Sequence, residues 1–152
     1  MTTAKDRQLG SDLTLYAARL VRLLRRELPQ PVGMRVLSML DETGPLGITQ
    51  LATIDQCSQP TMSGTVNGLV ERGWVTKRPD PADARGSLVD LTPAGRTVLA
   101  ETRLANGTAV ADRLVAAGVT GDELAAAVSV LRTLLDHDKD HDKDKDKDIS
   151  TP

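Results

Sequence analysis

Apolar and polar residues recur along this chain with the period of amphipathic helices. In residues 11–28, Leu13, Leu20 and Leu24 share one face of a helical wheel, while the arginines lie largely on the other faces. Similar spacing, with capping residues at the ends, predicts further helices downstream. The predicted helices cover residues 11–28, 32–42, 49–56, 58–72, 93–117 and 121–136.

Several residues mark the ends of these helices. Ser58 is a preferred N-cap, Pro60 is tolerated in the first turn, and Gly73 is a natural C-terminal stop. Thr92 followed by Pro93 opens the next long helix in the same way. The ends of these two helices are therefore predicted independently of the apolar spacing.

Two short strands interrupt the helices. Residues 74–78 and 87–91 flank the polar, turn-forming stretch PDPADARG, and together they predict a β-hairpin with a long tip. Helices, a hairpin and further helices in this order describe a mainly α protein with a small β-hairpin wing, a winged helix-turn-helix. We expect one domain over residues 1–136, with the winged lobe at about 32–92.

The charge of the chain is unevenly distributed. The net charge is −2, but from Asp136 onward there are seven Asp and four Lys, which leaves 15 basic against 14 acidic residues before that point. Alternating Asp and Lys offers nothing to bury, so we expect a disordered tail over residues 137–152 and no metal site at His137 or His141. A near-neutral folded region permits DNA binding only where its basic residues gather on one surface.

Several classes of protein are excluded by missing signals. The chain has no run of 18 apolar residues and no secretory signal, so we expect a cytoplasmic protein without membrane contact. P-loop, GxGxxG and GxSxG motifs are absent, and we predict no enzyme activity, cofactor or metal. The single cysteine, Cys57, is expected to be a small buried apolar residue. An oxidant-sensing thiol is the alternative, although no basic neighbour in the sequence would lower its pKa.

The chain contains a helix-turn-helix pattern that suits the major groove of DNA. The helices over 49–56 and 58–72 are joined by a tight turn, the geometry that lets the second helix enter the groove. In that second helix, four apolar residues form the side expected to be buried: Met62, Val66, Leu69 and Val70. The candidates for DNA contact are Ser58, Gln59, Pro60, Thr61, Ser63, Gly64 and Asn67, among which Gln and Asn can read adenine.

The predicted wing carries a second set of candidate DNA contacts. An arginine at the tip of a β-hairpin can enter a narrow, negatively charged minor groove, and Arg85 is the candidate for that position. Asp83 and Asp80 are expected to hold its guanidinium by paired hydrogen bonds. Lys77 and Arg78, at the base of the hairpin, suit phosphate contacts.

Three segments of the chain resemble the MarR family of bacterial regulators. ERGWV at residues 71–75, DPADAR at 80–85 and LTPAGR at 91–96 occur in that order and spacing in the family, and the last two together are a strong family marker. The resemblance implies an obligate homodimer whose interface is made by the helices at 11–28 and 93–136. It also implies that two winged lobes bind a palindromic operator in double-stranded DNA.

The resemblance further implies a small-molecule effector, because many members of the family release DNA on binding a small, often phenolic, ligand. A pocket between the first helix and the winged lobe would be lined by Leu and Met. Arg19, Arg22 or Arg35 would then meet an anionic head group. The protein is accordingly expected to be a repressor.

Two glycines depart from the family pattern. Recognition helices of the family often carry arginine where this chain has Gly64 and Gly68. Each interior glycine also costs a helix about 1 kcal/mol relative to alanine. We therefore expect operator binding to be weak or sensitive to salt, and a sub-nanomolar Kd at physiological salt would contradict this.

A DNA-binding regulator has two rival function classes. A winged-helix module that contacts proteins is favoured by the near-neutral charge and the two glycines, and salt-dependent retention on DNA separates it from a DNA binder. An enzyme would need a catalytic group, and the folded region offers none.

Overall fold

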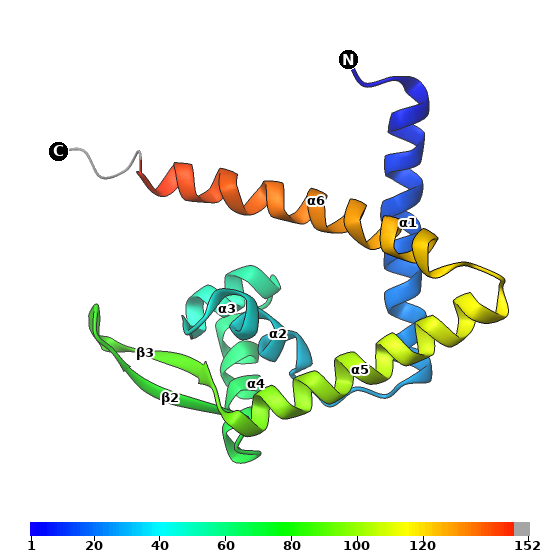
Figure 1. Cartoon of the computed structure of the whole chain (residues 1–152). Coiled ribbons are helices and arrows are strands. Elements are labelled where there is room, and N and C mark those ends of the chain that lie inside the picture. Colours follow the sequence, from blue (N-terminus) through cyan, green and yellow to red (C-terminus); the bar gives the residue numbers. More distant parts are fainter. Residues whose placement is uncertain (148–152) are drawn as a thin grey trace. The chain divides into compact units, whose positions relative to one another are not determined.

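The winged lobe and the C-terminal helix belong to separate structural units. The computed structural model describes residues 1–147, apart from the side chains of residue 84 and of residues 137–147. Its contacts divide the chain into Met1–Thr108 and Ala109–Pro152, and one helix runs across the boundary. The elements are α1 (Ala4–Glu27), α2 (Met34–Thr43), β1 (Leu46–Gly47), α3 (Ile48–Asp55), α4 (Gln59–Glu71), β2 (Val75–Asp80), β3 (Asp83–Leu91), α5 (Pro93–Ala116) and α6 (Gly121–Lys147), as Figure 1 shows. This order confirms the predicted winged helix-turn-helix.

Helix α1 begins seven residues before the predicted start. Thr3 is its N-cap: the Thr3 hydroxyl accepts the N–H of Asp6 at 3.1 Å, and the Asp6 carboxylate accepts the N–H of Thr3 at 2.8 Å. Hydrogen bonds from the hydroxyl and the backbone of Thr3 lower the pKa of Asp6. The polar first turns lack the apolar spacing used for the prediction, and this local capping pair sets the true start.

The sheet has three antiparallel strands in the order β1-β3-β2. Val75 pairs with Leu91 at the base of the hairpin, and β1, which was not predicted, adds the pair Leu46–Val89. The predicted long tip is wrong, because β2 continues to Asp80 and β3 starts at Asp83. Backbone pairing across the hairpin extends the ladder through polar residues that carry no apolar strand signal. The hairpin projects from the helices of the lobe (Figure 1).

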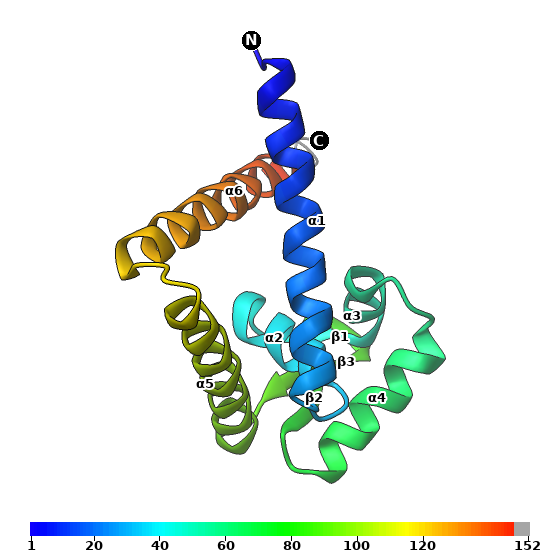
Figure 2. The same ribbon diagram turned by 90° about the vertical axis from the view of Figure 1, so that its right-hand side faces the viewer.

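The core of the lobe lies between α2, α3, α4 and the sheet, as Figure 2 shows from a second side. Leu37, Leu51, Leu69 and Val89, one from each of these elements, are completely buried. On α4 the predicted buried side is confirmed for Met62, Val66 and Leu69 but is wrong for Val70, which is 40% exposed. Val70 follows Leu69 directly, and a step of one residue on a helix turns a side chain away from the core.

Helix α6 continues through Lys147, so the helix overruns the start of the predicted disordered tail at residue 137. An α-helix satisfies its backbone hydrogen bonds within the segment, and a charged sequence with nothing to bury can therefore still be helical. The rest of the predicted tail, residues 148–152, lies outside the described residues. None of the described helices is long and apolar enough to cross a membrane.

Candidate nucleic-acid interface

The first turn of α4 is exposed and is capped by Ser58. Ser58 is the N-cap, as predicted: its hydroxyl accepts the N–H of Thr61 at 3.2 Å, and the two hydroxyl oxygens lie 2.8 Å apart. Both side chains are exposed, so they stay accessible to a ligand. Pro60 has no N–H, and the N–H of Thr61 is bonded to Ser58, so the turn offers a phosphate the positive end of the helix dipole and the N–H of Gln59.

The outer side of α4 is polar and accessible. Six of the seven predicted contact residues on this helix are exposed, and the seventh, Ser63, is half-buried. Gly64 and Gly68 have open space where a side chain would project. A partner surface can therefore approach the helix backbone closely at these two positions.

A hollow of about 640 Å³ lies between the helix-turn-helix and the wing. It is lined by Gln59 and Ser63 from α4 and by Arg85 from β3, so the structure brings these predicted residues to one surface. Thr49 and Gln50, at the start of α3, line the same hollow and were missed by the sequence analysis. The Gln59 amide nitrogen donates to the Thr49 hydroxyl at 3.1 Å, which ties the two helices together beside the hollow.

The two residues missed at the start of α3 had one recognisable signal. The side-chain oxygen of Gln50 accepts the N–H of Gly47 at 2.9 Å and so closes the first turn of α3. A glycine followed three residues later by glutamine is a weak helix-start pattern. It places Thr49 within an exposed first turn, where hydroxyl and amide groups suit phosphate contacts.

Asn67 and Lys77, both predicted to contact DNA, are bonded to each other. Nζ of Lys77 donates to Oδ1 of Asn67 at 2.7 Å and joins β2 to α4. An ammonium group can only donate, so the oxygen of Asn67 is fixed toward Lys77 and its two N–H donors remain for a partner. While this bond persists, Lys77 occupies one of the two lone pairs of the Asn67 oxygen, and the bidentate adenine contact would have to use the other.

The aspartates of the wing hold its backbone. Asp80 Oδ1 accepts the N–H of Ala82 at 2.8 Å, and Asp83 Oδ1 accepts the backbone N–H of Arg85 at 2.9 Å. The expectation that both carboxylates grip the Arg85 guanidinium is therefore wrong, because short side chains bond most readily to the turn they belong to. Arg85 and Arg78 are exposed on the wing, and neither forms an ion pair with a described side chain.

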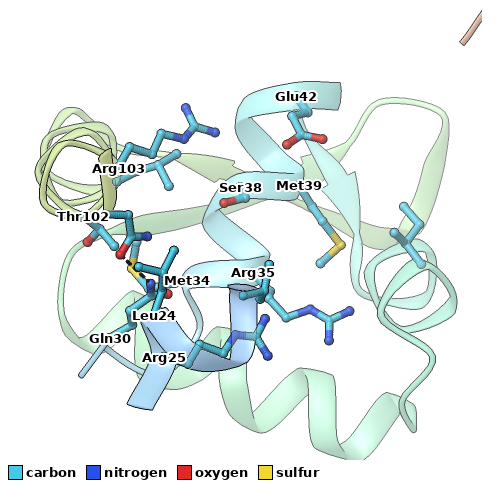
Figure 3. Close-up of a pocket in the computed structure, with 14 residues that line it drawn as sticks. Leu24, Arg25, Gln30, Met34, Arg35, Ser38, Met39, Glu42, Thr102 and Arg103 are labelled. Carbon is cyan, nitrogen blue, oxygen red and sulfur yellow. Dashed lines mark hydrogen bonds between the residues drawn. The ribbon is translucent and has the colours of Figure 1, made fainter. Parts of the chain in front are cut away.

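A second cavity, of about 360 Å³, lies inside the first unit among α1, α2, α3 and α5 (Figure 3). Its apolar wall includes Leu24, Met34, Met39 and Leu99, the kind of lining that the sequence predicted. Arginines from three helices also reach it: Arg25, Arg35 and Arg103. An apolar cavity with several converging charges can hold a small organic anion.

The three arginines predicted to meet a ligand lie at two different places. Arg35 lines the cavity of Figure 3. Arg19 and Arg22 line a separate hollow on α1, where the guanidinium of Arg19 lies 5.9 Å from the centre of the Tyr16 ring. The structure adds Arg25, three residues from Arg22 on the same helix, to the cavity.

Cys57 and Trp74 pack against the core. Cys57 is half-buried against the apolar cluster, in agreement with its predicted role as a small apolar residue. Trp74 packs against the same cluster, and the guanidinium of Arg72 lies 5.2 Å from the centre of its ring. Neither residue lines any of the cavities described above.

Comparisons with known proteins agree with this geometry. A family model described as MarR family matches residues 31–87. An HTH-type transcriptional regulator of Mycobacterium bovis is 31% identical over 136 residues, which cover 86% of this chain and 95% of that protein. Another, of Mycobacterium leprae, is 32% identical over 114 residues, or 72% of this chain and 80% of the relative.

A solved structure of a transcriptional regulator from Pseudomonas aeruginosa PA01 has the same fold. The TM-score is 0.72 at 25% identity, and the match covers 88% of this chain and 97% of that one. Bordetella bronchiseptica BpsR, whose DNA binding is regulated by 6-hydroxynicotinic acid, matches with a TM-score of 0.55 at 26% identity, over 84% of this chain and 98% of that one.

Proposed function

The chain belongs to the MarR family of DNA-binding transcriptional regulators, and we propose that it is a homodimeric repressor released from its operator by a small anionic ligand. Helix α4 enters the major groove and the wing places Arg85 in the adjacent minor groove. The observation that carries the DNA contact is the shared hollow, which Gln59 and Ser63 line from one side and Arg85 from the other. A duplex that fills this hollow meets several polar side chains and Arg85, together with the apolar side chains of Ile48 and Pro60.

The test is a gel shift with the DNA upstream of the protein's own reading frame, titrated across salt. Arg85→Ala should weaken the specific shift about tenfold, because an arginine contact to DNA is worth about 1–3 kcal/mol. Arg96→Ala is the matched control, because Arg96 is an exposed arginine on α5, outside the wing, α4 and the two helices proposed for the dimer, and it should leave the shift unchanged.

Two outcomes would count against this proposal. Equal affinity of the Arg85→Ala variant and the unaltered protein would remove the wing from the interface. No shift at low salt, even with genomic fragments, would favour the winged-helix module that contacts proteins, because binding through phosphate neutralisation is strongest at low salt.

The homodimer is proposed from apolar residues that each unit leaves exposed. Helix α1 exposes Leu9 and Tyr16 at 57% and 60%, and α6 exposes Leu134 and Leu135 at 61% and 63%. Contiguous apolar side chains on a helix surface mark an interaction site. A second copy of the chain, paired through these helices, would cover them and present two winged lobes to a palindromic operator.

The ligand is proposed for the cavity of Figure 3. Its volume of about 360 Å³ suits a small aromatic molecule, and its arginines favour a negative charge on that molecule. The regulation of BpsR by 6-hydroxynicotinic acid, a small aromatic acid, supports the same ligand class for this chain.

A further inference from the structure

The cavity of Figure 3 adjoins a second one through two shared arginines. A hollow of about 330 Å³ is also lined by Arg25 and Arg35, and it adds Asp55 from α3 and Thr65 from α4. Arg25 and Arg35 therefore line both an apolar cavity and a hollow that reaches the helix-turn-helix. Figure 3 shows the side chains of Arg25 and Arg35 extending in the same direction. Glu42, an acidic residue that also lines the apolar cavity, lies at the opposite end of the cavity from these two arginines.

The two arginines differ in what they already hold. Nη2 of Arg35 lies 2.7 Å from Oδ1 of Asp55, while Arg25 has no ion-pair partner among the described side chains. Arg103, the third arginine of the cavity, is held by Asp41 at 2.6 Å. A carboxylate that enters the cavity would thus find Arg25 free and would share Arg35 with Asp55.

One carboxylate oxygen of Asp55 lies in this ion pair. Its Oδ1 is buried and has no hydrogen bond, although it lies against Arg35, so the charge of Arg35 is what compensates it. Asp55 is the last residue of α3, and Gln56 after it has a φ of +54°, which is uncommon for a residue other than glycine. The ion pair therefore sits at the turn that orients α4.

We infer that Arg35 is shared between two carboxylates, that of an organic acid in the cavity and that of Asp55 at the helix-turn-helix. A bound carboxylate draws the guanidinium away from Asp55, leaves a buried oxygen uncompensated, and loosens the turn before α4. Ligand binding and DNA binding then oppose each other. By thermodynamic reciprocity, bound DNA lowers the affinity of the protein for the ligand by the same factor by which bound ligand lowers its affinity for DNA. Only the part of this inference that concerns DNA binding rests on the proposed function.

The test uses benzoate as the probe and benzamide as its neutral isostere, titrated into the full-length protein by calorimetry without DNA. Benzoate should bind and benzamide should bind about tenfold more weakly, because a charge-assisted hydrogen bond is lost. Asp55→Asn removes the competing charge and should tighten benzoate about fivefold. Arg35→Met should lower the affinity for benzoate about tenfold. Arg22→Gln, which alters a residue of the separate hollow on α1, should leave the affinity for benzoate unchanged.

The second measurement is operator affinity with and without saturating benzoate. Benzoate should lower the affinity of the unaltered protein about fivefold and should have little effect on the Asp55→Asn variant, in which the turn no longer depends on Arg35. Arg35→Lys, which keeps the charge but loses the planar fork, should fall between the unaltered protein and Arg35→Met in the calorimetry, and it serves as the folded substitute if Arg35→Met is unstable.

The possible failures are distinguishable. Equal binding of benzoate and benzamide, no binding of either, or equal benzoate affinity in the Asp55→Asn variant and the unaltered protein would overturn the inference. Absence of operator binding by the ligand-free protein would instead overturn the proposed function, and the calorimetric titrations would still decide whether Arg35 is shared.

Discussion

Gly95→Ala should destabilise the winged lobe by about 3 kcal/mol, a large fraction of the stability of a typical domain. A Cβ at this position would overlap the carbonyl oxygen of Trp74 and lie 3.3 Å from a methyl group of Leu91. A backbone oxygen cannot rotate away as the end of a side chain can. The clash must therefore separate the first turn of α5 from the segment that joins α4 to β2.

The neighbouring hydrogen bonds leave this contact little freedom. The Trp74 oxygen accepts the N–H of Thr92 at 3.1 Å, and the Thr92 hydroxyl donates to the oxygen of Gly73 at 2.6 Å. The same hydroxyl accepts the N–H of Gly95 at 3.1 Å. Movement of either segment to admit a methyl group would break these bonds and add their loss to the cost of overlap.

The measurement is the free energy of unfolding from urea titration, with Gly107→Ala as the matched control. Gly107 lies in the interior of the same helix with open space around it. Alanine there should stabilise the protein by about 1 kcal/mol, because glycine is the poorer helix former. If both variants unfold at the same urea concentration, the close approach of α5 to Trp74 is not a constraint on the fold.

Leu131→Glu should dissociate the proposed homodimer and, with it, most of the operator affinity. Leu131 lies three residues beyond Val128 and four before Leu135, on one side of α6, and all three are exposed in the single chain. A carboxylate there would be buried without a partner in an apolar interface. Because two linked lobes bind far more tightly than one, the apparent operator affinity should fall about a hundredfold.

Sedimentation equilibrium gives the oligomeric state, and the gel shift gives the affinity. Ser129→Glu is the control: Ser129 lies seven residues from both Asp122 and Asp136, on the polar side of α6, and the same charge should be tolerated there. A Leu131→Glu variant that sediments as a dimer would show that this side of α6 is not the interface.

Local signals in the sequence predict the order and type of most elements and the outer side of α4. The N-cap at Ser58, the Pro93 start of α5 and the spacing of Met62, Val66 and Leu69 act between residues within two turns of one another. Such signals depend on neighbouring residues alone and can be recognised without knowledge of the fold. The wing arginine followed from the same local pattern.

Contacts between residues distant in the sequence depend on how the elements pack together. β1 exists only because its residues pair with β3, and Gly95 is constrained only because Trp74 approaches it. Arg35 is joined to Asp55, twenty positions away, and Arg25 reaches the same cavity from another helix. Packing of the core sets these contacts, and packing depends on how whole elements dock rather than on any local spacing. For that reason the sequence offered Arg35 only as one of three candidate ligand contacts, while its ion pair with Asp55 became visible only in the fold.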